Sequence, residues 1–148
     1  MNTKDKFVAY FREVQPKFSR FYVNVLTQAD LTLPQYALLN ELARAGAISM
    51  TDVGKKLHIT KPAVTNLVDR LERHKFLKRI SHPKDRRVFL LEIQPGGQAL
   101  VQRIQGRVLK FLIEALNQFS ASEQKIITRF YASLAKRIDE SLTQCEKD

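Results

Sequence analysis

The sequence SMTDVGKKLHITKPAVTNLVDRLERHKFLKRISHPKDRRVFLLEI, residues 49–93, contains a single change of apolar period, and the architecture follows from it. As far as Arg73 the apolar residues recur at the three- and four-residue steps of a helix. From Phe76 onward they alternate as they do in a strand. The first part therefore predicts helices, and the second part predicts a β-hairpin.

Two short helices are expected in the first part. Ser49 or Thr51 can cap the earlier helix, and His58 with Ile59 then forms a tight turn. Thr60 can cap the later helix. The buried face of the later helix is expected to contain Val64, Leu67, Val68 and Leu71. Helices of about eight and thirteen residues joined by a three-residue turn are typical of a helix-turn-helix.

The hairpin is expected to pair residues 76–81 with residues 88–93 through the charged loop HPKDRR. Phe89, Leu91 and Ile93 share one face of the second strand. A helix-turn-helix followed by a basic hairpin is a winged helix. Cations crowded at the hairpin tip repel one another, whereas the negative potential of a narrow minor groove of DNA would stabilise them. The alternative is a solvated turn with a local Asp85–Arg87 pair, worth at most about 1 kcal/mol.

The winged helix predicts a set of DNA contacts, because the second helix of a helix-turn-helix fits the major groove. The predicted DNA-binding residues of that helix are Thr60, Lys61, Pro62, Ala63, Thr65 and Asn66, with Arg70 on a phosphate. Those of the hairpin loop are Lys84, Arg86 and Arg87, with Asp85 orienting an arginine.

The charge distribution agrees with a nucleic-acid partner. The chain of 148 residues carries a net charge of +10, from 25 Lys and Arg against 15 Asp and Glu. Residues 49–93 hold 11 basic and 5 acidic side chains, so this segment contributes +6 of that charge. A surplus of this size attracts phosphates. RNA is the less favoured partner, because the motifs of the common RNA-binding modules are missing.

Other classes of function lack their motifs. Neither a phosphate-binding glycine loop nor a nucleophile or metalloprotease motif is found, so we expect no enzyme and no cofactor. His58, His74 and His82 lack the spacing of a metal site. Cys145 is the only cysteine, so no internal disulfide can form. Without a signal peptide or an apolar run of spanning length, we expect a cytoplasmic protein with no membrane partner.

Long helices are expected on both sides of the winged helix. The first covers residues 5–28, with a kink or a restart near Lys17 caused by Pro16, and Thr32 with Pro34 begins the next. Pro95 begins another long helix, and the capping box of residues 120–123 begins the last. Apolar faces this long are expected to pack on a second copy in a two-fold homodimer, the alternative being an intrachain bundle.

The predicted fold class is therefore mainly α with a small β-hairpin. It is a winged helix-turn-helix flanked by N- and C-terminal dimerisation helices. The predicted segments are residues 1–32 for the N-terminal dimerisation helix, 33–94 for the DNA-binding domain and 95–148 for the C-terminal dimerisation helices.

Residues 31–97 resemble the MarR (multiple antibiotic resistance regulator) family of transcriptional regulators. The most specific pieces are PAVTNLVDRLE and DRRVFLLEI, in the family's order and separation. The resemblance implies a homodimeric repressor on a pseudo-palindromic operator, released by a small phenolic or lipophilic ligand. It assigns base reading to residues 61–66 and the wing's Asp-x-Arg to Asp85 and Arg87.

Four positions depart from the family pattern. Lys75 stands where the family has glycine after the recognition helix, so a left-handed cap there costs about 1 kcal/mol more. Asn66 stands where arginine is common, and Ile93-Gln94 replaces Leu-Thr after the wing. The ligand pocket is expected between the dimerisation helices and the winged helix, near Phe18, Tyr22, Tyr36 and Phe111. A competing hypothesis is a winged-helix protein-interaction module that no longer binds DNA.

Overall fold

The computed structural model describes residues 2–145, without the side chain of Cys145. The predicted segment 95–148 therefore ends in three residues that lie outside this description. The chain divides into two compact units, residues 1–108 and residues 109–148. The boundary falls inside one helix, α5 (Pro95–Leu116).

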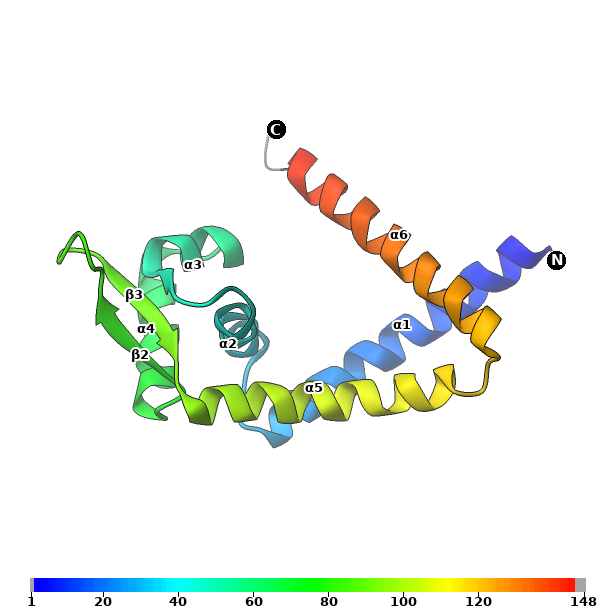
Figure 1. The fold of residues 1–148 in the computed structure, drawn as a ribbon, viewed down its shortest axis with the longest axis horizontal. Helices are drawn as coiled ribbons and strands as arrows, with labels where there is room; N and C mark the ends of the chain where they lie inside the picture. The colour runs from blue at the N-terminus through cyan, green and yellow to red at the C-terminus, as the bar shows by residue number, and fades with distance from the viewer. Residues whose placement is uncertain (1, 146–148) are drawn as a thin grey trace. The chain divides into compact units, whose positions relative to one another are not determined.

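The first unit is a helical domain with a small sheet, as predicted (Figure 1). Its elements in chain order are α1 (Thr3–Gln28), α2 (Leu33–Ala45), β1 (Ile48–Ser49), α3 (Met50–Leu57), α4 (Lys61–Arg73), β2 (Leu77–Ser81), β3 (Phe89–Ile93) and the first part of α5. The helix-turn-helix is formed by α3 and α4. We call β2, β3 and the loop 82–88 between them the wing.

Local side-chain hydrogen bonds explain where the helices begin. Thr32 and Gln35 form a capping box at α2, in which Gln35 Oε1 accepts from the Thr32 main-chain N–H at 2.9 Å. Ser49, rather than Thr51, caps α3, and Thr60 caps α4. These side chains satisfy amide groups that have no partner within the helix. The predicted helix starts at 33, 61 and 95 are confirmed.

Three left-handed residues end helices of the first unit, and none of them is a glycine. Asp30, His58 and Lys75 have φ values of 52°, 51° and 59°. At the end of α4, Lys75 N donates to Glu72 O at 2.9 Å and Phe76 N donates to Leu71 O at 3.0 Å. This bond pair is a Schellman motif, for which glycine is the usual residue at the position of Lys75.

The sheet has one more strand than predicted. Its order is β1-β3-β2, and both pairings are antiparallel. Ile48 pairs with Leu91 at one side of β3, and Arg79 pairs with Leu91 at the other. β1 has only two residues, too few to show an alternating pattern. Because β3 lies between the other two strands, β2 is an edge strand, and it lies beside α4.

Of the two expectations for Pro16, the restart near Lys17 is wrong, because α1 runs without a break through Pro16, and the kink stays a prediction. Proline removes one main-chain hydrogen bond from a helix interior, and the neighbouring turns of a 26-residue helix keep theirs. The buried residues of the described chain all lie between Val25 and Val108. Gly97 of α5 touches this core so closely that an added Cβ would lie 2.2 Å from Phe76 O.

The second unit contains the end of α5 and α6 (Ala121–Cys145). The predicted capping box is confirmed, since Ser120 N donates to Glu123 Oε2 at 2.8 Å and Glu123 N donates to Ser120 Oγ at 3.4 Å. Large apolar side chains of α6 are exposed, namely Ile126, Phe130, Tyr131, Ile138 and Leu142. Within the described residues no helix combines the length and the apolar character needed to cross a membrane.

Candidate nucleic-acid interface

The helix α4 buries one face and exposes the other. Val64, Val68 and Leu71 are buried in the core, as the periodicity predicted, whereas Leu67, predicted with them, is half-buried. Of the predicted base-reading residues, Lys61, Pro62, Thr65 and Asn66 are exposed and Ala63 is half-buried. Their side chains occupy the first two turns of α4, so the structure brings them together on one surface.

Close packing at the turn holds α3 against α4. A Cβ added at Gly54 of α3 would lie 3.3 Å from Ile59 O and 3.4 Å from the Val64 side chain. Ile59 N in turn donates to Gly54 O at 3.1 Å. The tight turn predicted from His58 and Ile59 therefore fixes the start of α4 relative to α3.

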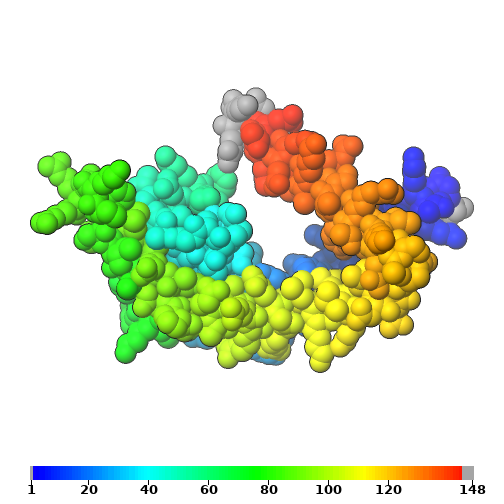
Figure 2. Space-filling view, viewed as in Figure 1, coloured from blue at the N-terminus to red at the C-terminus, as the bar shows by residue number. Residues whose placement is uncertain are grey.

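The wing loop stands out from the surface of the first unit (Figure 2). Asp85 organises this loop, because its carboxylate accepts the main-chain N–H of Arg87 at 3.0 Å and its carbonyl accepts that of Val88 at 3.0 Å. Within the described residues Asp85 has no ion pair with either neighbouring arginine. Asp85 thus shapes the main chain of the loop rather than holding a guanidinium group.

Four cationic side chains on α4 and the wing are available to an anionic partner. Lys61, Lys84, Arg86 and Arg87 are all exposed. None of them takes part in an ion pair of the described part of the chain. Their charges are therefore not neutralised by the protein itself.

Arg70, which we predicted to contact a phosphate, lies beside a carboxylate instead. Its Nη2 is 3.5 Å from Asp30 Oδ1, in the turn that follows α1. Both side chains are largely exposed, so this pair is weak. That Arg70 contacts a phosphate stays a prediction.

A second pairing was not foreseen. Arg79 of β2 donates from Nη2 to Asp69 Oδ1 at 2.5 Å and from Nη1 to Glu72 Oε2. Burial alone would lower the pKa of Arg79, and the hydrogen bonds and negative charges of Asp69 and Glu72 outweigh it, so that the pKa is raised. The sequence contained one sign of this pairing, because the i, i+3 spacing of Asp69 and Glu72 places both acids on one face of the helix.

Three of the four aromatic residues predicted near a ligand pocket pack together. Tyr22 stacks on Phe18 with ring centroids 6.2 Å apart and meets Tyr36 edge to face at 5.7 Å. Burial, followed by a hydrogen bond with Tyr36, raises the pKa of Tyr22 above its ordinary value. Phe111 belongs to the other compact unit and is partly exposed. That these residues line a ligand pocket stays a prediction.

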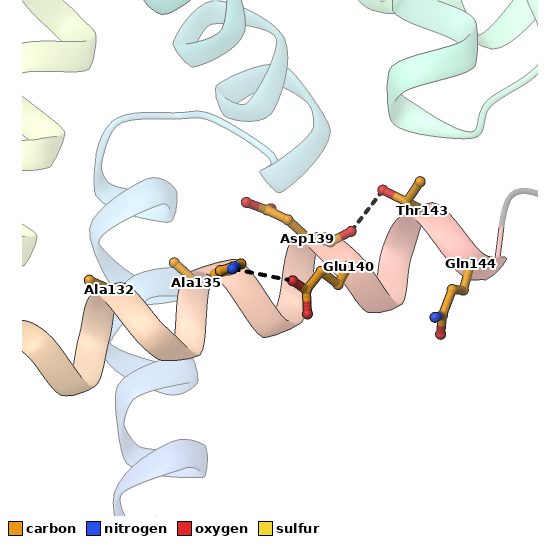
Figure 3. A pocket seen from close by; sticks show the side chains of 7 residues that line it. Ala132, Ala135, Asp139, Glu140, Thr143 and Gln144 are labelled. Atoms are coloured by element: carbon orange, nitrogen blue, oxygen red, sulfur yellow. Dashed lines mark hydrogen bonds and ion pairs between the residues drawn. The ribbon is translucent and has the colours of Figure 1, made fainter.

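A depression on the second unit is a helix surface rather than a cavity. Its lining comes wholly from α6 (Figure 3): Ala132, Ala135, Lys136, Asp139, Glu140, Thr143 and Gln144. Thr143 Oγ1 donates to Asp139 O at 2.9 Å, and Lys136 Nζ lies 3.9 Å from Glu140 Oε1. Among the residues described, no cluster of three or more His, Cys, Asp or Glu side chains could hold a metal ion.

Comparison with known proteins identifies this winged helix. Residues 29–88 match the model of the MarR family. The multiple antibiotic resistance protein MarR of Salmonella typhimurium is 30% identical over 94 residues, which are 64% of this chain and 65% of that protein. Residues 29–88 of this chain are thus similar to the MarR family. A MarR family protein from Bacillus stearothermophilus has the same fold, with a TM-score of 0.78 and 22% identity over 94% of this chain and 99% of that chain.

A further MarR-like fold has been solved with nucleic acid. A MepR mutant of S. aureus, bound to an oligodeoxyribonucleotide, matches 90% of this chain and 96% of its own with a TM-score of 0.69 and 24% identity. The matched residues 29–88 contain α2, α3, α4, β2 and the wing loop. The MarR family match therefore includes every predicted DNA-binding residue of this chain.

Proposed function

We propose that this chain is a homodimeric repressor of the MarR family that binds a pseudo-palindromic DNA operator and is released by a small ligand. The observation that carries the proposal is the exposed set Lys61, Lys84, Arg86 and Arg87, distributed over α4 and the wing and unpaired within the described residues. Uncompensated positive charges on one domain attract a polyanion. The MepR mutant solved with an oligodeoxyribonucleotide, which has the same fold, supports duplex DNA as that polyanion.

The first turns of α4 read bases in the major groove. Asn66 can donate to and accept from an adenine edge, while Pro62, Ala63 and the methyl group of Thr65 can pack on thymine methyls. Lys61 is better suited to guanine or to a phosphate. Arg70 exchanges Asp30 for a phosphate, because their exposed pair at 3.5 Å is weak.

The wing enters the neighbouring minor groove. Lys84, Arg86 and Arg87 are its cationic groups, and the negative potential of a narrow minor groove offsets their mutual repulsion. Asp85 keeps the loop in the required shape through its hydrogen bond to Arg87 N at 3.0 Å.

Residues 1–32 and 95–148 form the dimer around two copies of the winged helix, residues 33–94. The support is the apolar surface that each segment exposes. On α1, Tyr10, Phe11 and Val14 are 66%, 57% and 56% exposed, and on α6 Tyr131 and Leu142 are 60% and 59% exposed. Apolar patches of this kind on helices mark interfaces between proteins. A second copy is the partner that a symmetric operator requires.

The releasing ligand is a small phenolic or lipophilic molecule held near Phe18, Tyr22 and Tyr36. The support is the contact between these aromatic rings. A thermal-shift screen of phenols and medium-chain lipids tests this part. A hit is expected to raise the melting temperature and to lower DNA affinity, and a ligand that leaves DNA affinity unchanged would contradict release.

DNA binding is tested with a duplex recovered by the purified protein from a random-sequence pool. Its affinity is measured at two salt concentrations for the wild type, for Arg87→Ala and for Arg103→Ala. Arg103 is a matched control, because it is an exposed arginine of α5 outside the winged helix. Each lost phosphate contact lowers the slope of log K against log salt by about 1.

The expected result is a steep salt dependence that Arg87→Ala reduces and Arg103→Ala does not. A wild-type protein that retains no duplex would contradict DNA binding and favour the protein-interaction module. Equal effects of the two arginine substitutions would contradict a specific role for the wing.

A further inference from the structure

Arg79 connects the wing to the recognition helix through three contacts. Its guanidinium group spans Asp69 and Glu72, one turn apart on α4, and its main-chain N–H donates to Glu72 Oε1 at 3.1 Å. We call these three residues the Arg79 bridge. A planar guanidinium group that holds two carboxylates has a fixed orientation.

The Arg79 bridge lies at the edge of the sheet, where strand pairing alone does not attach the wing to α4. β2 is the edge strand of the order β1-β3-β2, and its main-chain N–H at Arg79 points to α4 rather than into the ladder. The main chain itself joins α4 to β2 through the short connection of residues 74–76. Glu72 therefore closes an open edge of the sheet and fixes the angle between helix and strand.

That angle decides where the wing loop lies. Lys84 follows Arg79 by five residues, so the two are at most about 16 Å apart at 3.3 Å per residue. A tilt of about 10° at the base would move the loop by about 3 Å, as much as a whole hydrogen-bond length. Cations at the loop cannot stay in a minor groove while α4 occupies the major groove if the base tilts this far.

The bridge also removes Arg79 from the set of cations that could bind DNA. Its single positive charge faces two carboxylates, and its side chain is only 23% exposed, whereas Asp69 and Glu72 are 48% and 37% exposed. Arg79 thus orients the wing relative to α4 and does not add to the attraction for DNA.

We propose that Arg79, held by Asp69 and Glu72, is a positioning residue that keeps the wing and the recognition helix in register on DNA. The proposal rests on the proposed DNA-binding function. It makes Arg79 essential for binding without any contact between Arg79 and the duplex.

Lys78 provides a matched control on the same strand. Its Nζ lies 2.9 Å from Glu92 Oε2 on β3, in a pair whose members are 50% and 44% exposed, and within the described residues neither of them has an ion pair with α4. Lys78→Gln and Arg79→Gln each remove one positive charge from β2. Any difference between the two variants therefore reports the link to α4 and not the charge of the protein.

The experiment measures affinity for the duplex that the wild-type protein recovers from a random-sequence pool, across a range of salt concentrations. Arg79→Gln is expected to lower affinity roughly tenfold or more, the value of at least one specific contact. For Arg79→Gln the slope of log K against log salt should fall by about 2 or more, because several wing cations leave the DNA together. Lys78→Gln should change neither quantity appreciably, and Arg79→Lys, which keeps one ion pair, should lie between.

A double-mutant comparison separates positioning from general destabilisation. Arg87→Ala should weaken binding strongly in the wild type and only slightly in Arg79→Gln, since the wing has already left the groove. A thermal melt of each variant is recorded alongside. A role limited to stability would shift the melting temperature but leave the loss caused by Arg87→Ala equal in both backgrounds.

Glu72→Gln tests the bridge from the helix side and replaces Arg79→Gln if that variant does not fold. If only electrostatics mattered, losing a carboxylate near DNA would strengthen binding. The bridge requires the opposite sign, a loss of affinity, so stronger binding by Glu72→Gln would overturn the proposal. Equal behaviour of Arg79→Gln and Lys78→Gln would overturn it as well, while a wild-type protein that retains no duplex would reject the proposed function and this inference with it.

Discussion

Lys75 provides a test of the backbone at the junction between α4 and the wing. Its φ of 59° lies in the left-handed region, and the hydrogen bonds of the Schellman motif hold it there. This conformation costs a residue with a Cβ about 1–2 kcal/mol, and glycine avoids that cost. Glycine in turn loses about 0.5–1 kcal/mol more conformational entropy on folding. Lys75→Gly should therefore raise the free energy of unfolding by about 0.5–1 kcal/mol.

Urea unfolding followed by circular dichroism measures this difference, at one protein concentration because a dimer's stability depends on it. Lys75→Ala is the control, since it removes the same exposed side chain and keeps the strained backbone. The alanine variant should show no comparable gain. If alanine stabilises the protein as much as glycine, the lysine side chain and not the left-handed backbone is responsible, and the reasoning is refuted.

Three other substitutions follow from particular contacts. Gly97→Ala should unfold or strongly destabilise the protein in a thermal melt, because the new Cβ would lie 2.2 Å from Phe76 O; an unchanged melting temperature would exclude this close approach. The pKa of Glu41 is lowered first of all by its hydrogen bond with Lys56. Above pH 4.5 the wild type should therefore have a free energy of unfolding up to about 1 kcal/mol higher than that of Glu41→Gln. This advantage should be lost as the pH falls through the pKa that Glu41 has in the folded protein. Unfolding curves at neutral and acidic pH check the trend, and a constant difference would count against the ion pair. Asn66→Ala should weaken binding to the selected duplex by about 1–3 kcal/mol and relax base preference at one position, whereas equal losses on all sequences would indicate a phosphate contact.

The helix starts could be predicted because caps are local. Thr32, Ser49 and Thr60 each bond an amide three residues further on, so the sequence contains both partners. β1 was missed because it depends on pairing Ile48 with Leu91, more than forty residues away. The restart of α1 near Lys17 does not occur, because the loss of one hydrogen bond does not end a long helix.

The exposed face of α4 and the cationic wing were also predictable, since periodicity alone determines which helix positions face away from the core. The partners of Arg70 and Arg79 were not. Asp30 and Arg70 are distant in sequence, and Asp69 meets Arg79 only after β2 has folded back along α4. Counting charges therefore identified a basic segment but could not separate the free cations from those that hold the structure.

Hydroxyl-radical cleavage of the selected duplex, with and without saturating protein, reports on both subunits at once. Two recognition helices related by a two-fold axis should protect two half-sites centred about 10 base pairs apart, with additional protection in the adjacent minor grooves where the wings lie. The flanking minor-groove protection should disappear with Arg87→Ala. Protection of a single half-site, or uniform cleavage along the whole duplex, would contradict a homodimer that reads DNA with α4 and the wing.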